Sequence, residues 1–274
     1  MASRTNEFTL IIKHDDEDVE AAELFVDGTI GGRLYRFRLD TGAARSSVMF
    51  DDYTSGFGSD GTSTSSGVFA NSSDDLIIVP NIDIGPIVKY NFTLVRAAGR
   101  DPGISNLIGM DLLKDFRCHF LFDENRVLID ANDDLDAGYG FQELLLDNTF
   151  HPYVDVRCGA SNAKAVWDTG ASITIVDSTF IEREPASFQE DGSTSGTDST
   201  GVKMETRMFI MAAAVIGDHV FPPHRVAAVD LSHVNSTIQV PMDLILGYTT
   251  LSKANWVFDF ARQRWALSKQ LGVS

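Results

Sequence analysis

The stretch Leu34-Tyr35-Arg36-Phe37-Arg38-Leu39-Asp40-Thr41-Gly42 joins an apolar, strand-like run to an Asp-Thr-Gly triplet. A second triplet, Asp168-Thr169-Gly170, follows another strand-like run at 164–167. The two aspartates are 168 − 40 = 128 residues apart, which is close to half of the 274-residue chain. A single triplet occurs by chance in roughly one chain of this length in ten or twenty. The informative feature is therefore the pair, in matched surroundings at a half-chain spacing.

The sequence around the triplets repeats as well. Matched segments in the two halves are Val26-Asp27 with Val154-Asp155, Ser66-Gly67-Val68 with Thr200-Gly201-Val202, Ile84-Gly85 with Ile216-Gly217, Leu107-Ile108-Gly109-Met110 with Ile245-Leu246-Gly247-Tyr248, and Phe122-Asp123 with Phe258-Asp259. A period of about 130 residues is too long for a solenoid unit, so it indicates duplication of a small domain. Duplicated domains tend to pack about a pseudo-twofold axis. We therefore expect the two aspartates to face each other.

The composition predicts an all-β fold. The chain has eighteen Phe, many Val and Ile, and no long helical period, and these features favour strands. With 43% apolar residues it is able to bury a sizeable core, as one large domain or two small ones. The boundary is placed in the acidic, glycine-bearing segment 131–140, which gives an N-terminal lobe at 1–135 and a C-terminal lobe at 136–274.

Charge and local patterns limit the partners. The net charge of −17 disfavours nucleic acid and anionic membranes, and it is interpreted as a solubility surface. No leader pattern and no run of eighteen apolar residues is present, so a soluble, cytoplasmic protein is expected. Cys118 and Cys158 are predicted to be reduced, partly buried thiols. No metal or other cofactor is expected, because the six histidines show no ligand spacing.

Two carboxyls within hydrogen-bonding reach have a defined chemistry. They cannot both ionise cheaply, so the pair holds a single proton over a wide acidic range. The ionised member would deprotonate a water while the protonated member donates to a carbonyl oxygen, which is general acid–base hydrolysis of an amide. The glycines of the triplets, Gly42 and Gly170, allow a tight turn and a close approach of two backbones. The hydroxyls of Thr41 and Thr169 are able to bond across to the partner loop.

These motifs closely resemble those of aspartic peptidases of the pepsin and retropepsin group. Half one contains Asp40-Thr41-Gly42-Ala43 and Leu107-Ile108-Gly109-Met110-Asp111, and half two contains Asp168-Thr169-Gly170-Ala171-Ser172 and Ile245-Leu246-Gly247-Tyr248-Thr249. The resemblance covers almost the whole chain. It implies an all-β, bilobal pepsin/retropepsin-like fold with a cleft between the lobes and short helices. Asp40 and Asp168 would form the dyad, whose shared proton is a known property of that group.

The resemblance also implies roles for neighbouring residues. Thr41 and Thr169 would interlock, and Gly109 and Gly247 would be structural glycines. Because one chain carries both aspartates, a monomer is expected. Ser172 would help to hold the dyad, whereas its counterpart in the first half is Ala44. Flap tips are suggested at Ser66-Gly67-Val68 and Thr200-Gly201-Val202, with plain solvated loops as the alternative.

The chain also departs from the pepsins, because only 39 residues precede Asp40. They are expected to be needed for strands, which predicts a retropepsin-sized variant without a pro-region.

Three functions follow as hypotheses. The leading one is an aspartic endopeptidase that cleaves extended peptides through a water activated by Asp40 and Asp168. The alternative is a non-catalytic peptide-binding or scaffolding protein that retains the fold, since fold alone does not give function. Glycoside hydrolysis is less favoured, because it needs carboxyls farther apart than this symmetry suggests. Trp167, next to Asp168, is expected in the core.

Overall fold

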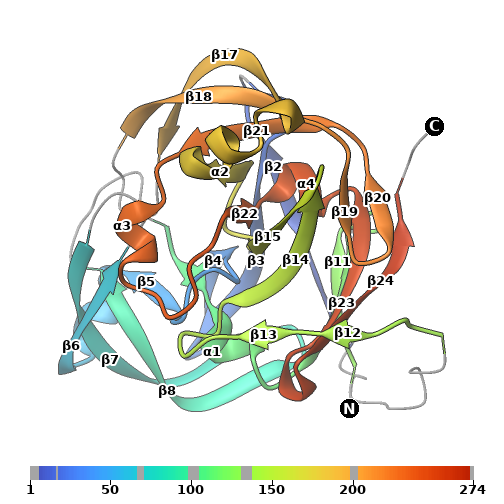
Figure 1. The fold of residues 1–274 in the computed structure, drawn as a ribbon. Coiled ribbons are helices and arrows are strands. Elements are labelled where there is room, and N and C mark those ends of the chain that lie inside the picture. The colour runs from blue at the N-terminus through green and yellow to red at the C-terminus, as the bar shows by residue number, and fades with distance from the viewer. Residues whose placement is uncertain are drawn as a thin grey trace.

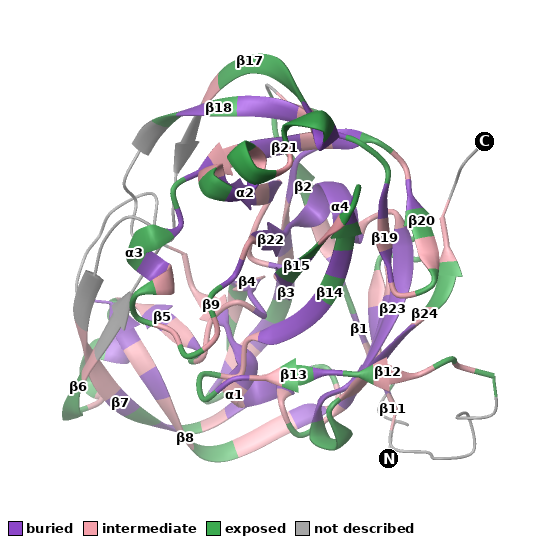
Figure 2. Ribbon diagram, viewed as in Figure 1, coloured by how far each residue is buried: buried purple, intermediate pink, exposed green. Residues whose placement is uncertain are grey.

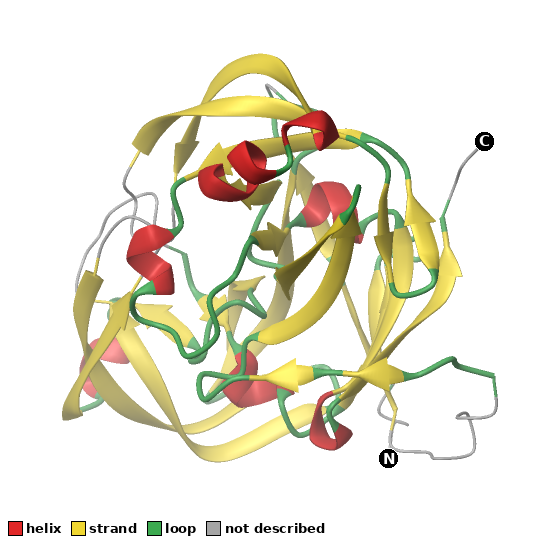
Figure 3. Ribbon diagram, viewed as in Figure 1, coloured by secondary structure: helices red, strands yellow, loops and turns green. Residues whose placement is uncertain are grey.

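Strands dominate the structure. In this computed structural model, the described residues are 6–16, 18–66, 71–97, 105–130, 138–197 and 203–271. Within them the chain folds into three sheets with a few short helices, as Figures 1 and 3 show. The predicted all-β fold is therefore confirmed. No helix among these residues is long and apolar enough to cross a membrane.

The first half of the chain forms a sheet in which eight strands are described, in the order β2-β3-β4-β9-β5-β8-β7-β6. Their bounds are β2 (Ile11–His14), β3 (Ala22–Ile30), β4 (Arg33–Leu39), β5 (Ser47–Met49), β6 (Ser59–Ser66), β7 (Asn71–Ile84), β8 (Ile87–Ala97) and β9 (Leu107–Ile108). The short helices here are η1 (Thr54–Gly56) and α1 (Met110–Leu113).

The second half forms a larger sheet, in the order β17-β18-β21-β16-β22-β15-β14-β19-β20, with β13 paired to β14. Its strands are β13 (Leu145–Leu146), β14 (Pro152–Cys158), β15 (Ser161–Trp167), β16 (Thr174–Asp177), β17 (Phe188–Thr197), β18 (Lys203–Met211), β19 (Ala214–Ile216), β20 (His219–Phe221), β21 (His224–Val229) and β22 (Leu244–Leu246). Its helices are α2 (Ser178–Arg183), η3 (Pro185–Ser187), α3 (Ser232–Asn235) and α4 (Tyr248–Leu251).

A third sheet joins the two halves, in the order β1-β11-β10-β23-β24-β12. Its strands are β1 (Glu7–Thr9), β10 (Arg117–Leu121), β11 (Arg126–Asp130), β12 (Gln142–Glu143), β23 (Ala254–Asp259) and β24 (Arg264–Gln270), and η4 (Phe260–Arg262) connects the last two. The central pair is β10 with β23, one strand from each half, in antiparallel register. The duplicated halves therefore share backbone hydrogen bonds as well as a core.

The two halves have equivalent topology. In the first half, β4 pairs in parallel with β9, and β5 pairs in parallel with β8. In the second half, β15 pairs in parallel with β22, and β16 pairs in parallel with β21. The structure thus repeats what the sequence repeats, and each Asp-Thr-Gly triplet directly follows the equivalent strand of its half, β4 or β15.

Hairpins occur where the sequence indicated turns. Gly31 and Gly32 connect β3 to β4 with φ of 56° and 82°, a conformation that glycine adopts readily. The polar, glycine-bearing composition of the segment 190–201 predicts a flexible stretch, whereas its described part forms a strand. Residues up to Thr197 pair with β18, with a bulge between Glu190 and Ser193. Serine and threonine there mark a solvent-facing hairpin (Figure 2).

The corresponding segment of the first half, at 51–73, is rich in Ser, Gly, Thr and Asp, a composition that predicts a flexible loop or a mobile hairpin. It contains η1 and the β6–β7 hairpin. The buried guanidinium of Arg96 ties this segment down, because it donates to the carbonyls of Thr54 and Phe57 at 2.8 and 2.9 Å and to Asp75 at 2.9 Å. The proposed flap residues Gly67, Val68, Thr200, Gly201 and Val202 lie outside the described residues. Ser66 is the last described residue of β6.

The core between the halves is aromatic. The Trp167 ring lies 4.6 Å from that of Phe120 and 4.5 Å from that of Phe258, and Trp256 and Trp265 extend the same cluster. Trp167 is fully buried, which confirms it as a core residue. Separately, Cys118 and Cys158 are both free and buried, which confirms the prediction of reduced thiols.

Candidate active site

Each Asp-Thr-Gly triplet is held by the sheet of its own lobe in the same way. The amide of Asp40 donates to the carbonyl of Ile108 at 2.9 Å, and the amide of Asp168 donates to that of Leu246 at 3.0 Å. The amide of Met110 then donates to Ala43 at 2.8 Å. Tyr248 and Ala171 make the equivalent bond at 2.9 Å. Equivalent backbone hydrogen bonds therefore hold both aspartates at the end of a strand.

Gly109 and Gly247 pass close behind these turns. A Cβ on Gly109 would lie 2.7 Å from the carbonyl oxygen of Ala43, and one on Gly247 would lie 2.3 Å from that of Ile173. No larger residue fits without moving backbone, which agrees with the structural role expected of both glycines.

Hydroxyl groups complete the support of the turns. Ser46 Oγ accepts from the amide of Gly109 at 3.0 Å, and Thr174 Oγ1 accepts from that of Gly247 at 3.1 Å. Ser46 in turn donates to Asp111 at 2.6 Å. Sequence reasoning missed these residues, although Ser46 and Thr174 are separated by the repeat offset of 128 and could have been found by it.

The two lobes interlock through the threonines of the triplets. The amide of Thr41 donates to Thr169 Oγ1 at 3.0 Å, and the amide of Thr169 donates to Thr41 Oγ1 at 3.1 Å. Thr41 Oγ1 also donates across the interface to the carbonyl of Trp167 at 2.8 Å. Both threonines are at most 1% exposed. These bonds set the separation of the neighbouring aspartates.

The glycines of the triplets let each carboxyl lie against the opposite loop. A Cβ on Gly42 would be 2.6 Å from Asp168 Oδ2, and one on Gly170 would be 2.3 Å from Asp40 Cγ. The amides of Gly42 and Gly170 both donate to Asp168 Oδ1, at 3.1 and 2.7 Å. The structure thus brings together the six residues of the two triplets at the interface of the lobes.

The surroundings of the two carboxyls affect their pKa values differently. Burial, followed by the charge of Asp168, raises the pKa of Asp40 well above its usual value, and Arg38 only partly opposes this. Burial also raises the pKa of Asp168, but the amides of Gly170 and Gly42 oppose the rise, as does a hydrogen bond from Asp40. The pair therefore titrates as one unit, and the amides of Gly42 and Gly170 favour the ionised form on Asp168.

Ser172 does not contact the dyad as the resemblance implies. Among the described residues no hydrogen bond joins its hydroxyl to Asp168, and its carbonyl accepts from the amide of Ala22 at 3.3 Å. The amides of Gly42 and Gly170 take over the role of holding the carboxylate. The absence of a hydroxyl at Ala44 therefore makes little difference between the lobes.

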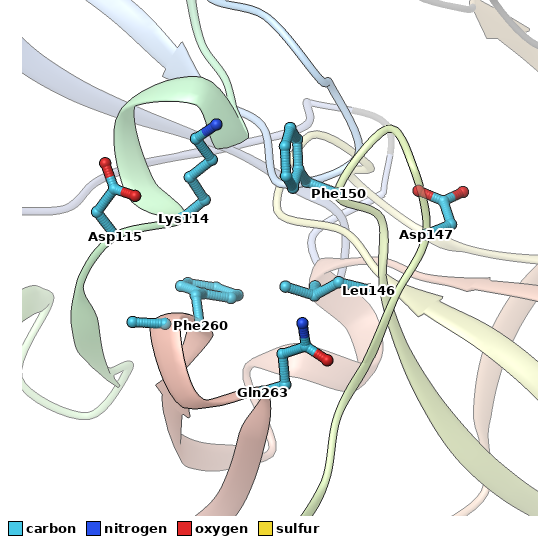
Figure 4. A pocket seen from close by; sticks show the side chains of 8 residues that line it. Lys114, Asp115, Leu146, Asp147, Phe150, Phe260 and Gln263 are labelled. Carbon is cyan, nitrogen blue, oxygen red and sulfur yellow. The ribbon is translucent and has the colours of Figure 1, made fainter.

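A cavity of about 360 Å³ lies away from the triplets. Figure 4 shows Leu146 and Phe260 facing each other across it, with Gln263 below them. Asp147 and Phe150, which also line it, belong to the loop that precedes β14. No group of three metal-ligating side chains is gathered in the described part of the chain.

The threonine interlock gives a first prediction. In a Thr41→Val variant the buried amide of Thr169 loses its acceptor, so the free energy of unfolding should fall by about 1–3 kcal/mol. Denaturant unfolding would measure this change. Thr41→Ser keeps the hydroxyl and should remain close to the wild type. A Thr41→Val variant as stable as the wild type would mean that the hydrogen bond from the Thr169 amide contributes nothing to stability.

Comparison with known proteins agrees on the fold. No protein-family profile matches the sequence, and no curated protein matches it either. Among solved structures, the aspartic proteinase from Irpex lacteus is similar with a TM-score of 0.56, at 14% sequence identity. The match covers 90% of this chain and 94% of that one. The chain therefore has the bilobal, sheet-rich fold of pepsin-like aspartic proteinases.

Proposed function

We propose that this protein is an aspartic endopeptidase whose catalytic residues are Asp40 and Asp168. The observation that carries the proposal is the pair of carboxyls packed at the lobe interface. Burial raises the pKa of both carboxyls, and two backbone amides oppose this rise at Asp168. Burial of a carboxyl pair without a compensating cation destabilises the fold, so its presence favours a catalytic role. Arg38 only partly offsets this cost for Asp40.

The geometry supports a direct attack by water. Asp168 removes a proton from a water whose oxygen adds to the amide carbon, while Asp40 donates its proton to the carbonyl oxygen. The tetrahedral diol then collapses, the C–N bond breaks, and the amine nitrogen takes up a proton from Asp168. Each carboxyl regains its starting protonation state after the diol proton returns to Asp40, so no covalent intermediate is needed.

The substrate would be a peptide held in extended form between the lobes, with the β6–β7 and β17–β18 hairpins reaching over it as flaps. A single chain supplies both aspartates, so a monomer is the proposed active form. Neither a cofactor nor a nucleic acid takes part in this mechanism. An intracellular, cytoplasmic location remains part of the proposal.

The alternative is a peptide-binding or scaffolding protein that keeps the fold without catalysis. Nothing in the dyad favours it, since both aspartates, both threonines and both glycines are in place. It becomes the conclusion if a well-folded protein cleaves nothing.

Cleavage of a mixed, unbiased peptide library from about pH 3 to 8 tests the proposal, with an Asp40→Asn/Asp168→Asn double variant as the blank. Activity should peak at acid pH and decline as the pH rises, because the raised pKa of Asp40 sets the point at which the dyad loses its proton. The cut sites would define the side-chain specificity. A wild-type protein that is folded but silent at every pH would overturn the assignment.

A further inference from the structure

The register of the strands identifies the nearest neighbours of the dyad. In the second lobe, β14 and β15 are antiparallel and their last pair is Tyr153 with Val166. Continuing this register by two residues places His151 opposite Asp168. In the first lobe, the β3–β4 pairing of Phe25 with Arg38 similarly places Glu23 opposite Asp40. Directly opposed residues have Cβ atoms roughly 5 Å apart, so these side chains flank the carboxyls.

The two flanking positions are equivalent but differ chemically. Glu23 and His151 are separated by 151 − 23 = 128 residues, the offset of the repeat. Glu23 forms an ion pair with Arg38 and lies 3.9 Å from Lys13. His151 instead contacts an acidic residue of its own loop, Asp147. The dyad is thus symmetric in its backbone and asymmetric in the residues that flank it.

Asp147 fixes His151 through several bonds. Its Oδ2 lies 2.8 Å from His151 Nδ1, and its Oδ1 accepts from the amide of His151 at 3.0 Å. Thr149 Oγ1 donates to Asp147 Oδ1 at 2.8 Å and lies 2.9 Å from the same imidazole nitrogen. The side chain of Asp147 is 1% exposed and that of His151 is 14% exposed. The imidazole is thus held in one orientation beside a buried carboxylate.

The loop between them is strained and anchored. Phe150 has a φ of 65°, a conformation that a bulky residue adopts only when its surroundings impose it. Its amide donates to the carbonyl of Asp147 at 3.0 Å. Its ring lies 4.2 Å from Nζ of Lys114, which follows α1 in the other lobe, and Figure 4 shows the two side chains together. Such strain concentrates at functional sites, so the placement of His151 is a functional candidate.

We propose that His151, held by Asp147, is a positioning residue that keeps Asp168 as the ionised partner of the dyad at acid pH. The proposal rests on the proposed peptidase function and adds a residue that acts through Asp168, without touching the substrate. Where the first lobe has the Glu23–Arg38 ion pair, the second lobe has His151. An imidazole is a group that gains its charge as the pH falls. A positive ring beside Asp168 therefore keeps the catalytic base ionised under conditions in which it would otherwise take up a proton.

Electrostatics agrees with this assignment. The charge of His151 lowers the pKa of Asp168, although burial outweighs it. Burial opposes ionisation of Asp147 as well, yet the hydrogen bond and charge of His151 lower the pKa of that carboxyl to about 2. The remaining titratable neighbour, Tyr153 of β14, has its ring 6.4 Å from the imidazole. Burial raises the pKa of Tyr153 and its hydroxyl donates to Val240 at 2.6 Å, so it stays neutral.

The experiment compares the pH profiles of kcat/KM for wild type, His151→Gln and His151→Lys. Removing the charge should move the acid limb, where Asp168 takes up its proton, upward by about one pH unit. His151→Lys restores a positive charge and should return the limb toward its wild-type position. His219→Gln, on the outer strand β20, is the matched control and should leave the profile unchanged. A His151→Gln profile lowered equally at every pH, with its acid limb unmoved, would overturn the proposal.

A second readout separates this proposal from the peptidase function. The carboxyl carbon of Asp168 can be titrated by ¹³C NMR in protein labelled at aspartate, with Asp168→Asn assigning the signal. In the wild type this signal should show a further inflection, and His151→Gln should abolish it. If no peptide is cleaved but the inflection is present, the proposed peptidase function is refuted and the proposed effect of His151 on Asp168 is supported. If the inflection is absent, the role of His151 is refuted whether or not peptides are cleaved.

Discussion

Asp40→Asn is expected to reduce peptide cleavage by about 10³-fold or more, and Asp168→Asn by a similar factor. Asparagine at position 40 has no acidic proton to transfer to the carbonyl oxygen, and asparagine at position 168 cannot deprotonate a water. Because the two groups act as a unit, the double variant should be little worse than either single one. Rates of cleavage of one peptide from the library, measured at the acid optimum, would test this.

The fold should survive these substitutions. Burial raises the pKa of Asp40, so the folded protein binds the proton more tightly than the unfolded chain does. A raised pKa contributes stability at low pH, and this contribution is lost as the pH rises through the folded value. The amide of an asparagine does not ionise in this range, so Asp40→Asn should be at least as stable as wild type at pH 7. A Tm well below that of the wild type would contradict this account of the dyad.

Retained cleavage would be equally informative. Full activity in Asp40→Asn would remove Asp40 from the catalytic assignment and leave the fold as the only link to the peptidases. A loss in Asp168→Asn alone would point to a mechanism with one carboxylate. Both variants keep the threonine interlock, so neither result could be attributed to separated lobes.

The sequence predicted the dyad because its features are local and repeated. Asp40 and Asp168 each lie in a triplet that follows an apolar strand, and their equal surroundings made a pseudo-twofold axis the natural arrangement. Thr41 and Thr169 could be assigned from the same symmetry. Strand pairing of the main hairpins also followed from short turn signals such as Gly31-Gly32.

Other features depend on contacts that composition does not encode. Residues 190–197 are polar and looked unstructured, but a ladder with β18 makes them a strand. The role of His151 requires the register of β14 against β15, which becomes known only once the strands are paired. The repeat did not reveal His151, because a search for identical residues in the two halves passes over this position, where the first half has Glu23.

The interface of the halves contains a buried ion network around Asp259. Asp259 of β23 is 4% exposed, and its Oδ2 accepts from Arg117 of β10 at 3.0 Å. The same oxygen accepts from Arg264 at 2.9 Å. Arg117 is also buried and additionally lies 3.9 Å from Asp130. Since β10 and β23 come from different halves, the ion pair between Asp259 and Arg117 links one half to the other.

Asp259→Asn should therefore lower the free energy of unfolding by about 3–5 kcal/mol, because it leaves the buried Arg117 without its main counter-charge. Denaturant unfolding followed by tryptophan fluorescence would measure the loss, since Trp256 and Trp265 pack in the same sheet. The amide retains one acceptor oxygen for the two guanidinium groups, but it no longer accepts from the amide of Arg262, which donates to Asp259 Oδ1 at 3.3 Å.

The repeat supplies a matched control for this prediction. Asp123 is the counterpart of Asp259 in the first half, and it also bridges the halves, through Asn255 and Lys269 at 2.6 and 2.7 Å. Its side chain is 25% exposed, against 5% for Asp259. Because Asp123 is more exposed, water solvates its partners when the charge is lost. Asp123→Asn should therefore lower the free energy of unfolding clearly less than Asp259→Asn does. Equal losses of unfolding free energy in the two variants would mean that Asp130 already compensates the charge of Arg117. The buried position of Asp259 would then add nothing to the stability of the contact between the lobes.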